Sequence, residues 1–112
     1  MGEIKTLGYY VNGEWKKSST EHYTDAFDPS TGEVIAKVPC CTAAEVEEAI
    51  ASAKKAFPSW SATPVKKRVQ ILYRVRELLY EHMEELTMSV AKENGKAWSE
   101  AEGDVLKAVE GT

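Results

Sequence analysis

The spacing of apolar residues changes near residue 42, and this change constrains the fold more than any other feature of the sequence. Before it, apolar residues stand in short runs bounded by glycine, proline and asparagine, which is typical of strands and hairpins. After it, they recur every three or four residues, which is typical of amphipathic helices. The sequence therefore predicts a strand and hairpin arm over residues 1–41 and a helical segment over residues 42–112.

Turn residues divide the arm into strands. Asn12-Gly13 stands between Tyr9-Tyr10-Val11 and Glu14-Trp15 and predicts a two-residue hairpin turn, because both central residues of such a turn need a positive φ. The run Asp-Pro-Ser-Thr-Gly at 28–32 predicts a second turn, between a short strand over 23–27 and a strand over 34–38 that Pro39 ends. Three or four short strands can hardly form a self-sufficient sheet.

The first helix has a clear beginning. Thr42 and Glu45 have the spacing of a capping box, in which hydroxyl and carboxylate bond the free amides of the first turn. Pro58 is expected to end this helix. Its predicted buried face consists of Val46, Ala49, Ile50, Ala53 and Phe57.

Three further helical stretches follow. Thr63 is expected to cap the second helix with Pro64 at its first position, and near His82 the apolar stripe continues or restarts. Gly95, with Asn94, should close the third stretch in a left-handed conformation, and a last helix should run from about 98 to 110. The predicted buried face of the second helix is Val65, Val69, Leu72, Val75, Leu78 and Leu79.

Composition limits the class of protein. The 112 residues are 43% hydrophobic and 29% charged, which fits one modest globular domain and is too apolar for a disordered chain. Fourteen basic and eighteen acidic residues give a net charge of −4 without a basic stripe, so nucleic acid is not an expected partner. No secretory signal or membrane span is expected. Cys40 and Cys41 are adjacent and form no disulfide framework, which fits a cytoplasmic location.

An ordered series of short motifs resembles the start of the aldehyde dehydrogenase superfamily. The motifs are Tyr10-Val11-Asn12-Gly13-Glu14-Trp15, the run 28–36, Val38-Pro39, Thr42-Ala43-Ala44-Glu45-Val46, Ala56-Phe57-Pro58-Ser59-Trp60, Arg68 with Leu72, and Glu93-Asn94-Gly95-Lys96. Within the superfamily, Glu93-Asn94-Gly95-Lys96 followed by Ala101-Glu102-Gly103-Asp104-Val105 is similar to the CoA-acylating methylmalonate-semialdehyde dehydrogenases.

This resemblance implies an α/β fold, in which residues 1–112 are the N-terminal part of a Rossmann-like cofactor domain and the catalytic domain is absent. It implies an oxidoreductase that takes a small aldehyde, passes hydride to NAD or NADP and releases the acyl group to CoA or water. A homo-oligomer, dimer or tetramer, is also implied. The family's catalytic and cofactor-binding residues would all follow Thr112, so the chain alone is expected to be inactive.

Three candidate sites follow from the resemblance and the residues. Lys107 stands where the subfamily has an arginine thought to hold the substrate carboxylate; a solvated lysine is the alternative. The resemblance implies that Glu93 and a backbone carbonyl near Ala26 are ligands of a structural monovalent cation. The alternative is that Glu93 is a helix-end carboxylate in a local hydrogen bond. Cys40 and Cys41 precede a helix start, which favours thiolates, but packing or loop cysteines are the better interpretation.

Two other functions stay open at this stage. The chain can be a stand-alone helical interaction module with a hairpin arm, whose apolar faces bind a partner protein. It can also serve mainly as a subunit-contact or structural element of a larger chain.

Overall fold

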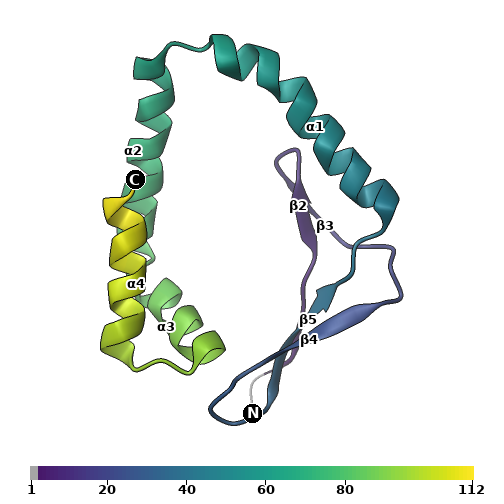
Figure 1. Ribbon diagram of the computed structural model, residues 1–112, viewed down its shortest axis with the longest axis vertical. Coiled ribbons are helices and arrows are strands. Elements are labelled where there is room, and N and C mark those ends of the chain that lie inside the picture. Colours follow the sequence, from purple (N-terminus) through teal and green to yellow (C-terminus); the bar gives the residue numbers. More distant parts are fainter. Residues whose placement is uncertain (1–2) are drawn as a thin grey trace. The chain divides into compact units, whose positions relative to one another are not determined.

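The computed structural model describes residues 3–112, which form five short strands and four helices (Figure 1). This mixed composition confirms the predicted α/β class. The backbone divides into two compact units: the strands with the first helix, and the remaining helices with the turn Asp28–Gly32. The elements are β1 (Lys5–Thr6), β2 (Tyr9–Val11), β3 (Glu14–Lys16), β4 (Tyr23–Phe27), β5 (Val34–Pro39), α1 (Ala43–Ala62), α2 (Val65–Glu81), α3 (Met83–Asn94) and α4 (Trp98–Glu110).

The strands of the first unit form two small sheets. The larger has the order β1-β5-β4, with β1 parallel and β4 antiparallel to β5. Strand β1 was not expected, because Lys5–Thr6 carries no apolar pattern and depends on pairing with Ala36 and Lys37 of β5. Strand β1 can therefore be predicted only when its pairing with β5 is known, and not from the local sequence.

The predicted hairpin is confirmed as the second sheet. Strands β2 and β3 pair around Asn12 and Gly13, whose φ angles are 52° and 80°. These are the positive values that a two-residue turn requires. Tyr10 and Trp15 pair across the ladder, with ring centroids 5.2 Å apart in an edge-to-face arrangement that stabilises the hairpin.

Helix α1 begins at the predicted capping box. The carboxylate of Glu45 also accepts hydrogen bonds from residues outside this box, which the sequence did not indicate. The Glu45 amide donates to Thr42 Oγ1 at 3.3 Å, and the Thr42 amide donates to Glu45 Oε2 at 2.9 Å. Ser18 Oγ, the Ser19 amide and Ser19 Oγ also donate to this carboxylate, at 2.7, 2.7 and 3.0 Å. Glu45 therefore ties the loop after β3 to the start of α1.

The prediction that Pro58 ends α1 is wrong, because the helix continues through Pro58 to Ala62. Proline removes one backbone donor and crowds the preceding turn, but its fixed φ is helical, and the backbone continues for one more turn beyond it. Ser59 Oγ and Ser61 Oγ donate to the carbonyls of Ala56 and Pro58, both at 3.1 Å, in the part of the helix around the proline.

The beginning of α2 is shifted by one residue from the prediction. Pro64 has ψ 139°, which is extended, so it occupies the N-cap position and Val65 is the first helical residue. The Pro64 side chain offers no cap hydrogen bond. The Pro64 carbonyl instead accepts from the amides of Lys67 and Arg68. Between α2 and α3 the apolar stripe restarts, because His82 (φ −105°, ψ 18°) leaves the helical conformation.

The second unit contains the larger part of the buried core. Ala101, Val105 and Val109 recur every four residues on α4 and are buried where α4 packs against α3 and, more briefly, α2. Thr87 of α3 is fully enclosed. The last helix therefore spans the predicted residues.

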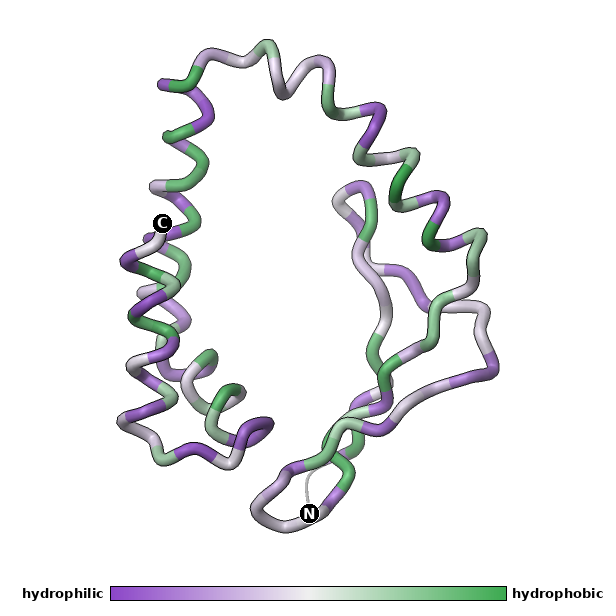
Figure 2. The backbone as a smooth tube through the Cα atoms, in the orientation of Figure 1, coloured by the Kyte–Doolittle hydropathy of each residue, from purple (hydrophilic) through white to green (hydrophobic). Residues whose placement is uncertain are grey.

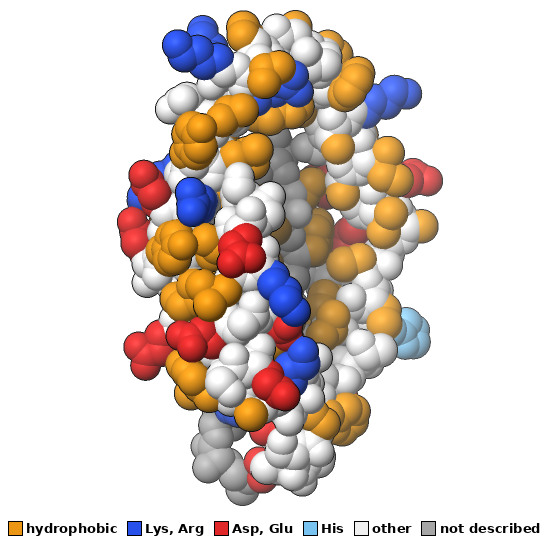
Figure 3. Space-filling model, turned by 60° about the vertical axis from the view of Figure 1, so that its left-hand side comes forward, with side chains coloured by type: hydrophobic (Ala, Val, Ile, Leu, Met, Phe, Trp, Pro, Cys, Tyr) orange, Lys and Arg blue, Asp and Glu red, His pale blue; other side chains and the backbone are white. Residues whose placement is uncertain are grey.

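The predicted burial of the α1 and α2 faces is wrong for the chain as it stands. No residue of either helix is buried, and Ile50 and Phe57 are 61% and 65% exposed. Figure 2 shows hydrophobic and hydrophilic positions alternating along both helices, so the amphipathic pattern is present although the described residues do not cover it. Hydrophobic side chains reach the surface among the charged ones in Figure 3. None of the helices among residues 3–112 combines the length and apolar character needed to cross a membrane.

The turn at Asp28–Gly32 packs against the end of α3. Asp28 accepts bonds from the amides of Ser30, Thr31 and Gly32, and Gly32 has φ 76°. Gly95 closes α3 with φ 65°, as predicted, and a Cβ there would lie 3.0 Å from Pro29 Cγ and 3.2 Å from Ser30 Oγ. Gly95 is thus required by its backbone conformation and by this close approach.

The Glu45 network predicts acid sensitivity of the first unit. The Ser19 amide, and next the Ser18 hydroxyl, lower the pKa of Glu45 from 4.5 to about 2. Because the folded pKa is depressed, the stabilisation is present above pH 4.5 and is lost as pH falls toward 2. We expect Glu45→Gln to remove this part of the pH dependence of helix content measured by circular dichroism. Glu47→Gln, an exposed control on the same helix, should leave it unchanged; equal curves for both variants would contradict the role of Glu45.

Two glycine substitutions should have opposite effects. Gly95→Ala places a Cβ at positive φ and against Pro29, which should destabilise the second unit by about 1–2 kcal/mol. Gly103→Ala lies inside α4 with no atom within 4 Å of the new Cβ, and should stabilise it by about 0.5–1 kcal/mol. Urea unfolding of both variants measures the difference. A neutral Gly95→Ala would show that the turn does not pack there.

Candidate functional site

Lys107, the predicted substrate contact, lies on the exposed side of α4. Its side chain is 79% exposed, and its Nζ lies 3.9 Å from Oδ1 of Asp104, one helical turn earlier. The separation leaves the ammonium group mostly hydrated and accessible to a second anion. The Lys107 ammonium is therefore open to solvent, and its role as a substrate contact stays a prediction.

Asp104 has a second and closer basic partner. Lys96, which follows Gly95 in the loop between α3 and α4, donates from Nζ to Asp104 Oδ2 at 2.5 Å. This hydrogen bond lowers the pKa of Asp104 below its usual value and raises the pKa of Lys96. Lys96, Asp104 and Lys107 form a lysine–aspartate cluster with a net charge of +1 at neutral pH.

The cluster adjoins an apolar cavity. Asp104 lines a cavity of about 230 Å³ between α2, α3 and α4, whose other walls are hydrocarbon. The charged group at the edge of this cavity is the Asp104 carboxylate, and Lys96 and Lys107 approach that carboxylate without lining the cavity. Each lysine supplies a point charge and not the planar, two-pronged contact of an arginine. The other lining residues are Leu79, Leu86, Val90, Val105 and Ala108.

The two residues predicted for a monovalent cation site belong to different units. Ala26 lies on β4, at the irregularity in its pairing with β5, and Glu93 lies in the last turn of α3. Residues 3–112 contain no group of three or more histidine, cysteine or acidic side chains arranged for a metal ion. A site built from one carboxylate and a backbone carbonyl stays a prediction.

The two cysteines are free thiols at the junction between β5 and α1. Cys40 is exposed, and its amide donates to the His22 carbonyl at 2.9 Å, which extends the β4–β5 ladder by one pair. Cys41 is half-buried and lines an apolar groove of about 400 Å³ between the hairpin and α1. Tyr9, Tyr10, Val46, Ala49, Ile50 and Ala53 line the same groove.

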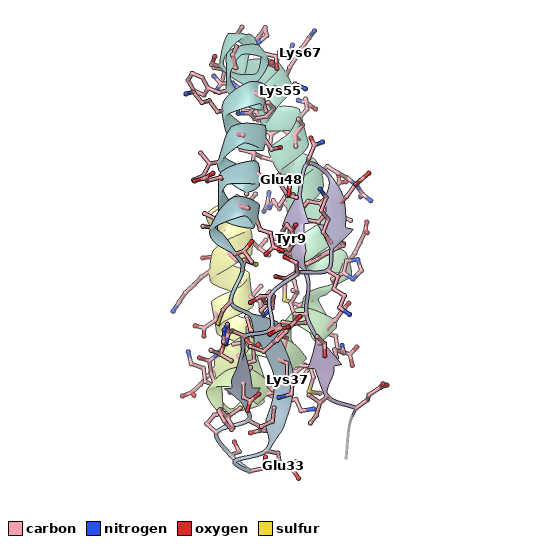
Figure 4. The ribbon with its side chains drawn as sticks, turned by 90° about the vertical axis from the view of Figure 1, so that its right-hand side faces the viewer. Tyr9, Glu33, Lys37, Glu48, Lys55 and Lys67 are labelled. Carbon is pink, nitrogen blue, oxygen red and sulfur yellow. The ribbon has the colours of Figure 1, made fainter. Side chains whose placement is uncertain are left out.

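Hydrogen bonds at Glu48 join the hairpin to α1 one turn beyond Glu45. Lys16 Nζ donates to Glu48 Oε1 at 2.5 Å and Tyr9 Oη donates to Oε2 at 3.5 Å. Figure 4 shows Tyr9 and Glu48 facing each other between the hairpin and the helix. Together with Glu45, these contacts fix the apolar groove.

Sequence reasoning missed the partners of Asp104 and the two serine partners of Glu45. The Asp104–Lys107 spacing is three residues on a predicted helix and could have indicated that pair. Lys96 lies eight residues from Asp104 across a loop, and Ser18 lies 27 residues from Glu45, so local spacing carries no information about these two contacts.

Comparison with known proteins decides the family. The family model described as "Aldehyde dehydrogenase family" matches residues 15–112, which is most of the chain. The chain belongs to the aldehyde dehydrogenase family. The resemblance of the ordered motifs is thereby confirmed.

Related family members include several semialdehyde dehydrogenases. Malonate-semialdehyde dehydrogenase 2 of Oceanobacillus iheyensis is 46% identical over 107 residues, covering 96% of the chain and 22% of that protein. The malonate-semialdehyde dehydrogenase of Bacillus velezensis is 44% identical over 110 residues, covering 98% of the chain and 23% of that protein. This aldehyde dehydrogenase chain therefore spans less than a quarter of the length of these relatives.

Solved aldehyde dehydrogenase structures show the same fold. A protein assigned as a methylmalonate-semialdehyde dehydrogenase from Sinorhizobium meliloti, solved with NAD, has a TM-score of 0.91 and 30% identity, covering 98% of this chain and 22% of that one. The methylmalonate-semialdehyde dehydrogenase of Oceanimonas doudoroffii has a TM-score of 0.89 and 32% identity, covering 96% and 22%.

Proposed function

We propose that this chain is the N-terminal part of the cofactor domain of an NAD(P)-dependent semialdehyde dehydrogenase that oxidises malonate semialdehyde or its methyl derivative. The observation that carries the proposal is the identity of 40–46% to proteins named malonate-semialdehyde dehydrogenases over at least 96% of the chain. Such substrates carry a carboxylate and a short carbon chain, which is the chemistry that the lysine–aspartate cluster and its apolar neighbour suit.

We propose that the cofactor site of this reaction lies outside this chain. A dinucleotide is held where a strand passes through a glycine-rich turn into a helix. The junction of β5 with α1 is Pro39-Cys40-Cys41-Thr42, which has no glycine. We therefore place the binding of NAD or NADP, and that of CoA if CoA accepts the acyl group, on other residues of a larger protein.

The proposed role of this segment is support and recognition. The groove between the hairpin and α1 and the uncovered faces of α1 and α2 would pack against the remainder of the enzyme or a second subunit of a homo-oligomer. Lys107 would attract the substrate carboxylate. The thiolate that adds to the aldehyde carbon, in the reaction class of the family, would come from the catalytic domain.

A chimeric enzyme tests the proposal. The segment of the Oceanobacillus iheyensis malonate-semialdehyde dehydrogenase 2 that aligns with this chain is replaced by the chain itself. We expect the chimera to reduce NAD with malonate semialdehyde at a kcat within about tenfold of the parent, and the 112-residue chain alone to show no aldehyde-dependent reduction. A folded chimera that oxidises neutral aldehydes but not malonate semialdehyde would contradict the proposed substrate class. It would favour the interpretation as a structural or interaction segment.

The role of Lys107 predicts a selective defect. Lys107→Ala in the chimera removes one charged hydrogen bond to the substrate, so KM for malonate semialdehyde should rise about tenfold while KM for propanal stays unchanged. Lys92→Ala, which removes an exposed lysine of α3, is the matched control. Equal increases for both aldehydes would remove Lys107 from substrate recognition.

A further inference from the structure

The carboxylate of Asp104 is shared unequally between two lysines. Oδ2 accepts a short bond of 2.5 Å from Lys96, whereas Oδ1 lies 3.9 Å from the Lys107 ammonium, beyond hydrogen-bond distance. The Lys96 side chain is 40% exposed and that of Lys107 is 79% exposed. The short contact is therefore Lys96–Asp104, which spans the loop, and the long contact is Lys107–Asp104, which lies within α4.

This asymmetry determines which lysine can bind another anion. Lys96 compensates most of the negative charge of Asp104, so Lys107 is not drawn into a close pair although it lies one turn away on the same helix. Without Lys96, the uncompensated carboxylate would attract the Lys107 ammonium and occupy its donors. Lys96 thus acts on Lys107 through Asp104.

We infer that Lys96 is a positioning residue that, by pairing with Asp104, keeps the Lys107 ammonium available to the carboxylate of an acidic aldehyde, and that an unpaired Asp104 would withdraw it. The inference rests on the proposed function and adds to it two residues that set substrate preference without touching the substrate. Gly95 contributes indirectly, because its left-handed conformation places Lys96 at the beginning of the loop that returns to α4.

Two substitutions in the chimera should have opposite effects. Lys96→Met should raise KM for malonate semialdehyde about two- to fivefold, the size expected for an exposed ion pair, because Asp104 then captures Lys107. Asp104→Asn should lower that KM by a similar factor, because Lys107 is released. KM for propanal and kcat should change little in both. Lys96→Arg should restore parental values, and Lys92→Met is the matched control.

The double variant and amine labelling separate positioning from general loss of structure. In the Asp104→Asn background, Lys96→Met should have no further effect on KM, which is the non-additivity expected when one residue acts through another. Acetylation of Lys107 by acetic anhydride, quantified by mass spectrometry, should slow in Lys96→Met and accelerate in Asp104→Asn.

The outcomes distinguish this inference from the proposed function. Unchanged Lys107 acetylation in Lys96→Met would overturn the positioning pair whatever the kinetics show. Acetylation that changes as expected while KM for malonate semialdehyde does not would overturn the link between the pair and the substrate. If the unsubstituted chimera oxidises propanal but not malonate semialdehyde, the proposed function fails independently of the labelling result.

Discussion

The carboxylate of Glu45 is the contact on which the first unit depends. It accepts four hydrogen bonds, from the hydroxyl groups of Ser18 and Ser19 and the amides of Ser19 and Thr42. One side chain therefore caps α1 and anchors the loop that leaves the hairpin. Because the helix start is fixed in this way, its apolar face lies beside Tyr9 and Tyr10 and the groove between them is formed.

The turns and helix ends could be predicted from neighbouring residues in the sequence. The features that depend on contacts between distant residues could not. The Asn12-Gly13 turn, the Thr42–Glu45 box and the Gly95 cap were predictable, since each depends on residues within one turn. Strand β1 and the Lys96–Asp104 pair were not, because each needs a partner that only the folded chain brings near. Pro58 shows a third case: proline usually ends a helix, but α1 continues for one turn beyond it.

The exposed apolar faces of α1 and α2 fit a chain that matches only part of the length of its relatives. The amphipathic pattern of α1 and α2 predicts a buried face, yet the described residues leave these faces exposed. The chain belongs to the aldehyde dehydrogenases and matches about 22% of the length of its relatives. Both observations support the proposal that these faces pack against other parts of a larger enzyme. Lys107 of the lysine–aspartate cluster, in contrast, carries a charged side chain that is 79% exposed.

Amide hydrogen exchange over α1 tests this central proposal most directly. Exchange is measured for residues 43–62 in the 112-residue chain and in the chimeric enzyme. If the apolar face of α1 is covered in the complete protein, its amides should exchange at least about tenfold more slowly in the chimera than in the chain alone. Equally slow exchange in both would show that the helix needs no further partner, and would contradict the account.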